Sequence, residues 1–195
     1  MKKTRLRPLL IASIALAASV ALSDESPQGW FKAGSSPKDY ETAVDRETVH
    51  EGKPSASLKS IVPSPAGFGT LMQTAQAGQY RGKRVRMSGY VRAKDVTQWA
   101  GLWFRVDGPK HEPLAFDNMQ QRAVKGTSDW AKYEIVLDVP EAAKEIAFGL
   151  LLTGPGQVWM AGLKFEPVGT DVAVTGTKIG NETVHPAPTN LNFDK

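Results

Sequence analysis

One aromatic and two charged side chains near the middle of the chain have the types that a sugar site needs. Alternation along an extended strand over residues 101–107 places Trp103 and Arg105 on one face, and Asp117 follows in the next apolar segment. A bound sugar needs an aromatic plane under its C–H face and planar polar groups beside its hydroxyls. The pattern therefore predicts a shallow glycan-binding groove, with Trp103 as its platform and Arg105 and Asp117 as its polar core.

Four further side chains could complete this groove from adjacent strands and loops: Tyr90, Gln73, Arg122 and Trp99. Trp99 precedes its strand in a Thr-Gln-Trp-Ala-Gly loop, from which it could lean over the rim. The groove requires Trp103, Arg105 and Asp117 to lie together on one concave sheet face. It fails if Trp103 points between the two sheets and Phe104 points outward.

A purely structural role accounts for the same residues equally well. Arg105 and Asp117 could form a cross-strand ion pair, with Trp103 packed on the stem of a neighbouring arginine. The domain would then be a protein-interaction or accessory envelope module without a sugar ligand. A sugar module should leave Trp103 or Trp99 accessible beside unpaired polar groups, whereas an interaction module should expose a flatter apolar patch or an open edge strand.

The residue types required for catalysis do not converge anywhere in the sequence. None of the three histidines, His50, His111 and His185, has a second histidine at metal-ligand spacing, and no Gly-x-Ser-x-Gly elbow is present. Asp107 and Asp117 are the one carboxylate pair that could in principle cleave a glycoside. We therefore expect a binding module that is not an enzyme.

Short β-strands are the elements expected to position these residues. Apolar, β-branched and aromatic segments alternate with Gly, Pro, Asp and Lys turns, which predicts strands at 40–44, 55–61, 69–75, 84–92, 101–106, 114–119, 133–139, 146–152 and 158–165. The very apolar segment 146–152 should be a central strand covered on both sides. Nine short strands predict an all-β fold in which two antiparallel sheets form a sandwich.

Several short motifs resemble a bacterial family of galactose-binding-like jelly-roll domains: Gly29-Trp30-Phe31, Asp39-Tyr40-Glu41, Tyr80-Arg-Gly-Lys-Arg-Val85, Trp99 to Gly108, Phe116-Asp-Asn-Met119, and Gly126 to Trp130 with Tyr133. The family is similar in layout to the carbohydrate-binding modules of glycan-degrading enzymes. Its members occur alone behind signal peptides or fused to transcription regulators. The resemblance covers roughly residues 29–168 and implies a jelly-roll β-sandwich, with carbohydrate binding implied only by analogy.

One departure from that pattern concerns a metal. Such modules commonly close with Val-Trp-x-Asp-Asp, whose acids help to hold a structural calcium ion, whereas this chain has Val158-Trp-Met-Ala-Gly162. Calcium needs six to eight oxygen ligands, and neither Ala nor Gly side chains supply one. We therefore expect no cofactor, and a calcium site that is missing or built from backbone and other acids.

The two ends of the chain differ from its middle. A basic start followed by an apolar run at 9–22 is typical of a signal peptide cleaved after Ser23, and its length of about 14 residues is too short for a membrane-spanning helix. We expect a signal peptide at 1–23, a polar lead-in at 24–28, the domain at 29–168 and a periplasmic or secreted product. Residues 169–195 are expected to form a flexible tail, in which 190–194 could add a strand near Trp30.

The charge balance argues against nucleic-acid and membrane-surface partners. The chain has 24 Lys and Arg against 20 Asp and Glu, but its first 23 residues hold four of the cations and no acid, which leaves twenty of each. A neutral domain has no broad electrostatic footprint for DNA, RNA or anionic lipid. The absence of cysteine excludes disulfides, a thiol nucleophile and a thiolate metal site.

Overall fold

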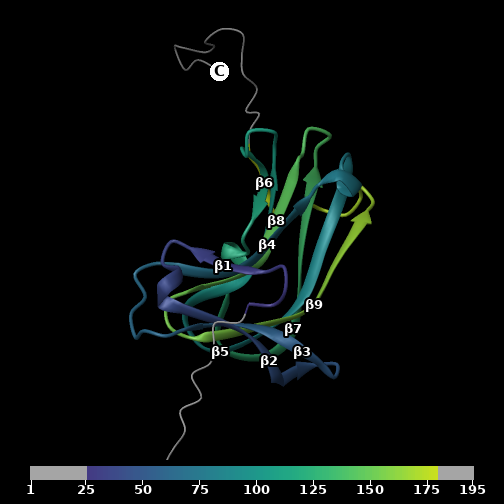
Figure 1. The fold of residues 1–195 in the computed structure, drawn as a ribbon. Coiled ribbons are helices and arrows are strands. Elements are labelled where there is room, and N and C mark those ends of the chain that lie inside the picture. Colours follow the sequence, from purple (N-terminus) through teal and green to yellow (C-terminus); the bar gives the residue numbers. More distant parts are fainter. Residues whose placement is uncertain (1–25, 180–195) are drawn as a thin grey trace, which may run out of the picture.

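The computed structural model describes residues 26–179, and this part of the chain consists of β-strands and single turns of 3-10 helix (Figure 1). The predicted signal peptide at 1–23 and the predicted strand at 190–194 lie outside it. The strands are β1 (Phe31–Gly34), β2 (Tyr40–His50), β3 (Lys53–Ser60), β4 (Phe68–Gln76), β5 (Lys83–Asp107), β6 (Pro113–Asp117), β7 (Val124–Val139), β8 (Glu145–Thr153), β9 (Gln157–Val168) and β10 (Thr177–Lys178). The 3-10 turns are η1 (Pro37–Asp39), η2 (Gly78–Tyr80) and η3 (Gln120–Arg122). None of these helical turns is long and apolar enough to cross a membrane.

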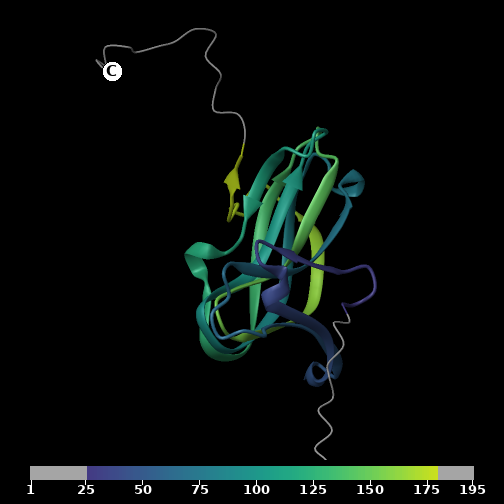
Figure 2. The ribbon, with the colours of Figure 1, turned by 60° about the vertical axis from the view of Figure 1, so that its left-hand side comes forward.

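The strands form two layers that share β5 (Figure 2). The second half of β5 pairs with β8 and β6, and the first layer continues from β8 to β4 and β1 and from β6 to β10. The first half of β5 pairs with β7 and β9, and the second layer continues from β9 to β3 and β2. All of these pairings are antiparallel, so the fold is the predicted jelly-roll sandwich, with its two layers joined through one strand.

β5 passes from one layer to the other where its ladder with β7 is irregular. The register shifts between Val91 and Ala93, again before Val96, and again before Ala100. Asp95 lies in this stretch with a φ of 54°, in the left-handed region. Such bulges bend a strand and increase its twist, so the two predicted strands at 84–92 and 101–106 are the two halves of one bent strand.

The core lies between the layers and follows the predicted alternation. Leu102, Phe104 and Val106 from the second half of β5 are fully buried and belong to one cluster with Val85 and Met87 from its first half. Every residue from Ile146 to Leu152 is also buried, and β8 lies between β4 and β5. The expectation of a central strand covered on both sides is therefore confirmed.

Tyr40 closes one end of this core. Its ring is fully buried and its hydroxyl donates to the carbonyl of Gly67 at 2.8 Å. Burial raises the pKa of Tyr40 above its ordinary value. A Cβ on Gly69 would lie 2.5 Å from Cγ of Tyr40, so only glycine allows β4 to approach the ring this closely.

Two short strands were not among those predicted. β1 is half-exposed and too short for alternation to reveal it, and β10 lies in the segment assigned to the tail. Residues 169–179 run along β7 and β6: Thr175 exchanges backbone and side-chain hydrogen bonds with Val136, and Thr177 lies opposite Phe116. The packed part of the chain thus extends beyond Val168.

Candidate functional site

Trp103 lies on the outer face of the first layer, as alternation predicts. Phe104 points between the layers, whereas Trp103 packs with Ala147 and Leu151 in a separate cluster on the opposite side of the sheet. The indole is only 6% exposed, and its Nε1–H donates to Oγ1 of Thr70 at 2.7 Å. Trp103 is therefore a fixed part of the surface and offers little open ring area.

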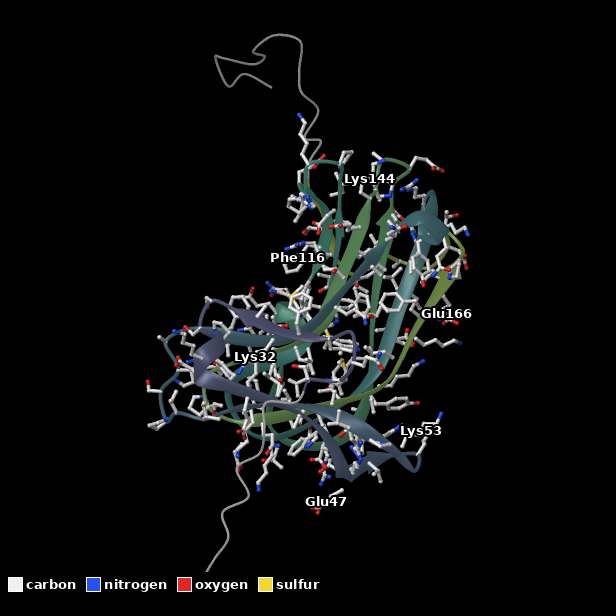
Figure 3. The ribbon with its side chains drawn as sticks, in the orientation of Figure 1. Lys32, Glu47, Lys53, Phe116, Lys144 and Glu166 are labelled. Carbon is white, nitrogen blue, oxygen red and sulfur yellow. The ribbon has the colours of Figure 1, made fainter. Side chains whose placement is uncertain are left out.

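A cavity of about 270 Å³ opens on this outer face, which we call the pocket face. Its lining comes from five strands: Ala33 and Gly34 of β1, Phe68, Thr70 and Met72 of β4, Trp103 and Arg105 of β5, Phe116 of β6, and Leu151 of β8. Phe116 projects on the side of the molecule where β1 lies (Figure 3). The pocket is a hollow in an apolar, largely aromatic surface with one charged side chain.

Arg105 is held by a carboxylate on its own strand. Its Nε donates to the two carboxylate oxygens of Asp107 at 2.8 and 3.0 Å, and its Nη2 donates to one of them at 2.9 Å. The Asp107 side chain is 4% exposed, whereas that of Arg105 is 41% exposed. The expected pairing of Arg105 with Asp117 is therefore wrong, because the partner is the residue two positions along the same face.

Asp117 lies on the other side of the sheet. It is directly opposite Phe104 in the β5–β6 ladder, so its side chain shares the side of Phe104 rather than that of Trp103. It accepts hydrogen bonds from Nη2 of Arg122 at 2.7 Å, from the backbone N–H of Met119 at 2.8 Å and from the hydroxyl of Thr175 at 2.5 Å. Asp117 and Arg122 form a structural ion pair, and neither residue lines the cavity.

The Asp107 and Asp117 carboxylates also fail as a catalytic pair. They point to opposite sides of the sheet and each is engaged by its own arginine. Two carboxylates on opposite sides of a sheet cannot flank one glycosidic bond. Within residues 26–179, no three His, Asp or Glu side chains lie close enough together to hold a metal ion.

The three remaining predicted residues fall in three different places. Trp99 lies on the pocket face and packs beside Trp103, but it does not line the cavity. Gln73 lies opposite Phe148 on the core side, where its Nε2 donates to the carbonyl of Gly29 at 3.0 Å. Tyr90 belongs to the second layer and stacks on His50 with ring centroids 4.0 Å apart.

Two of the lining residues that sequence reasoning missed are neighbours of residues that it chose, whereas Ala33, Gly34, Phe68, Thr70 and Leu151 are not. Phe116 lines the cavity instead of Asp117, and Met72 lines it instead of Gln73. A shift of one residue along a strand reverses the face, and the pairing register decides which of two neighbours points outward. The preference for polar residues in a groove selected the wrong member of each pair.

A second hollow lies on the outer face of the second layer, which we call the charged face. It has a volume of about 620 Å³ and a polar lining that includes Thr48, Arg92, Lys94, Asp129 and Trp159. The Trp159 indole is 6% exposed and donates from Nε1 to Oδ2 of Asp45 at 2.7 Å.

Asp45 is a half-buried acceptor whose charge is stabilised locally. Burial alone would raise its pKa, but hydrogen bonds from the backbone N–H groups of Thr48 and Glu47 and from the Trp159 indole outweigh burial and lower the pKa below its ordinary value. Trp159 is thus anchored to a charged group, unlike Trp103.

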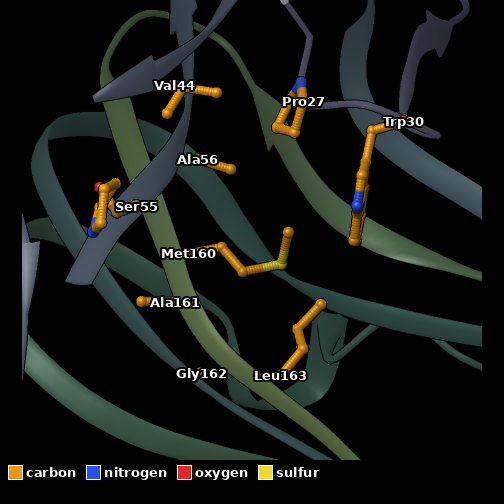
Figure 4. A pocket seen from close by; sticks show the side chains of 10 residues that line it. Pro27, Trp30, Val44, Ser55, Ala56, Met160, Ala161, Gly162 and Leu163 are labelled. Atoms are coloured by element: carbon orange, nitrogen blue, oxygen red, sulfur yellow. The ribbon is translucent and has the colours of Figure 1, made fainter. Parts of the chain in front are cut away.

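A third cavity, of about 260 Å³, lies at the mouth between the layers (Figure 4). Pro27 and Trp30 of the N-terminal segment face Met160 and Leu163 across it. The polar groups among its lining side chains are the Trp30 indole N–H and the Ser55 hydroxyl, which donates its proton to the carbonyl of Thr48 at 2.6 Å. No charged side chain lines this cavity.

No protein-family model matches the chain. A relative with a matching sequence is the HTH-type transcriptional regulator YbfP of Bacillus subtilis (strain 168), which is 43% identical over 173 residues. The match includes 88% of this chain, which spans 58% of the regulator's length.

Solved structures with a similar backbone include carbohydrate-binding modules. The CBM22-1 xylan-binding domain of Paenibacillus barcinonensis Xyn10C has a TM-score of 0.52 at 16% identity, over 73% of this chain and 88% of that one. The C-terminal family 22 carbohydrate-binding module of Clostridium thermocellum Xyn10B has a TM-score of 0.52 at 11% identity, over 75% of this chain and 89% of that one.

An enzyme also contains this fold. The enzymatically active domain of bacteriophage CBA120 tailspike protein 4 matches with a TM-score of 0.52 at 13% identity, over 72% of this chain and 20% of that one. Identities this low establish a shared fold and leave the ligand to the site itself. The chain is therefore a β-sandwich with the backbone arrangement found in carbohydrate-binding modules.

Proposed function

We propose that this chain is a non-catalytic binding module whose ligand is a carbohydrate held in the cavity of the pocket face. The observation that carries the proposal is the hollow itself, with Phe68, Trp103 and Phe116 in its lining and the fixed guanidinium of Arg105 beside them. Ligand pockets are typically concave and mostly apolar, with a few placed polar groups that fix orientation. This cavity has that composition.

The aromatic side chains take different parts in this proposal. Trp103 is almost fully buried and bonded to Thr70, so it forms the floor. Phe68 and Phe116 are half-buried and supply the accessible ring surface on which a sugar's C–H face can lie. Aromatic rings bring large contact area at little cost in side-chain entropy, which favours stacking at these two positions.

The proposal includes export to the periplasm or the outside of the cell. Its support is the basic start and the apolar run at 9–22, together with the near-neutral remainder of the chain. A sequence similar to 88% of the chain also occurs in a transcription regulator, which supports a module used in more than one protein context. A glycan or another envelope component is the partner that fits this location.

A second candidate function is protein interaction through the same face. Phe31 favours it, because this residue of the edge strand β1 is 45% exposed and lies opposite Met72, on the pocket side of the sheet. An exposed apolar side chain on an open edge is typical of a protein-binding surface. The pocket would then receive one side chain of the partner.

A glycan array separates these functions. The full chain is compared with Ala33→Phe, which fills the cavity from β1, and with Ala43→Phe, which adds the same ring on β2. Both alanines are half-buried and both lie on edge strands at opposite ends of the strand order. We expect glycan binding in the parent and in Ala43→Phe and its loss in Ala33→Phe. Absence of any glycan binding by the parent would overturn the carbohydrate proposal and favour the protein partner.

A further inference from the structure

The hydrogen-bonding groups of the pocket are mostly engaged with one another. The Thr70 hydroxyl accepts from the Trp103 indole at 2.7 Å and donates to the carbonyl of Leu150 at 2.8 Å. Both carboxylate oxygens of Asp107 accept from Arg105. The floor strands β4, β5 and β8 lie inside the sheet, where backbone carbonyls take part in the ladder.

One group keeps unused donors. Asp107 engages Nε and Nη2 of Arg105, and no hydrogen bond joins Nη1 to any residue in the described part of the chain. A guanidinium has five N–H donors in a fixed fork and no acceptor. The other side chains lining the cavity, from Ala33, Phe68, Met72, Phe116 and Leu151, offer no oxygen or nitrogen. Among the lining side chains, the unused hydrogen-bonding capacity therefore lies mainly in the donors of Arg105.

This imbalance restricts what a ligand can place beside Arg105. A sugar hydroxyl offers Arg105 a single acceptor oxygen and brings a proton that needs an acceptor of its own. A carboxylate only accepts, and its two oxygens match the spacing of guanidinium N–H groups. The best-matched ligand group is therefore a carboxylate attached to a ring whose C–H face contacts the apolar lining.

We propose that the ligand is an acidic sugar of the uronic acid class, with its carboxylate on the free edge of Arg105 and its ring over Phe116 and Phe68. This inference rests on the proposed carbohydrate function of the same cavity. Asp107 balances the charge of Arg105, so recognition depends on the fork geometry more than on net charge. Lysine is consequently a poor replacement, because an ammonium group cannot hold Asp107 at two points and also present a planar donor edge.

The test uses glycan pairs that differ only at the carboxylate. The full chain is titrated calorimetrically with glucuronate-bearing and galacturonate-bearing oligosaccharides and with the same oligosaccharides after reduction of the carboxylate to the alcohol. Binding to at least one acidic member should be about tenfold tighter than to its reduced partner, as expected for a lost charge-assisted hydrogen bond. Arg105→Lys should remove this preference.

Arg92→Lys is the matched control. Arg92 is 44% exposed, close to the 41% of Arg105, and lies on the charged face near Trp159. It should keep the full preference for the acidic member. Circular dichroism and thermal melting confirm that both variants are folded, so a lost preference reports on the site.

The outcomes separate the inference from the function on which it rests. Equal or tighter binding of the reduced glycans overturns the uronic acid assignment and leaves a carbohydrate module in place. Binding of sulfated glycans in preference to uronates also overturns it. Binding of no glycan, acidic or neutral, overturns the carbohydrate function and this inference together. If the Arg105→Lys variant keeps the preference for the acidic glycan, another group recognises the carboxylate. This result likewise overturns the assignment.

Discussion

Trp103 and Trp159 have the same exposure but opposite surroundings. Each indole is 6% exposed on the outer face of its layer, and each donates a 2.7 Å hydrogen bond. Trp103 bonds to a hydroxyl and lies in an apolar hollow, whereas Trp159 bonds to the carboxylate of Asp45 and lines a polar one. Burial and hydrogen bonding alone therefore do not distinguish a ligand site from a structural anchor.

The difference lies in the side chains around each indole. On the charged face, opposite charges are paired in a row, with Arg86 between Glu134 and Glu166 and a lysine beside each acid. The side chains of this row are partly exposed and are paired with one another. On the pocket face, the one arginine in the cavity lining is held by a buried acid and its surroundings are apolar, which leaves a surface that a ligand can cover.

The largest expected effect is a loss of stability that is similar for the two tryptophans. Trp103→Ala and Trp159→Ala should each lower the free energy of unfolding by about 3–5 kcal/mol, because each removes a buried ring and strands a hydrogen-bond acceptor. Urea denaturation followed by circular dichroism measures both. A Trp103→Ala variant as stable as the parent would contradict the floor position of this indole.

Replacing Arg105 should lower the free energy of unfolding more than replacing Arg92. Arg105→Met leaves the Asp107 carboxylate, 4% exposed, without its partner and should cost about 1–3 kcal/mol. Arg92→Met loses a 3.7 Å contact with the 87% exposed Asp129 and the position of its guanidinium 5.8 Å from the Trp159 ring, and should cost about 0–1 kcal/mol. Urea midpoints of the two variants, measured side by side, give the difference. Equal costs would mean that the Arg105–Asp107 pair is no better fixed than a surface contact.

The smallest effect is a pH dependence limited to the Trp159 side. The pKa of Asp45 is lower in the folded state than its ordinary value, so the stability that it contributes is full above the ordinary carboxyl pKa and is lost as pH falls through the lowered value. The difference in unfolding free energy between the parent and Asp45→Asn should shrink over that acidic range. The difference between the parent and Thr70→Val should stay constant there, because the Trp103 acceptor does not titrate. A constant Asp45→Asn difference would refute the charged anchor.

The sequence predicts the layers better than it predicts the pocket. Alternation places Phe104 in the core and Trp103 outside it, because one strand's pattern is enough to separate two faces. The facing of Asp117 and Gln73 depends on how β6 and β4 pair with their neighbours, and composition does not reveal that register. The Arg105–Asp107 pair is accessible to alternation, because the two residues share a face, although the structural interpretation of the sequence pairs Arg105 with Asp117.

The central claim is that ligand binds at the pocket face rather than at the charged face, and the indole N–H signals of the five tryptophans test it most directly. Two-dimensional nitrogen–proton spectra of the full chain are recorded as glucuronate-bearing and neutral oligosaccharides are added, with Trp103→Phe and Trp159→Phe used to assign the two signals. The account predicts that a bound oligosaccharide shifts the Trp103 signal and leaves the Trp159 signal in place. A shift of Trp159 with Trp103 unmoved would contradict it.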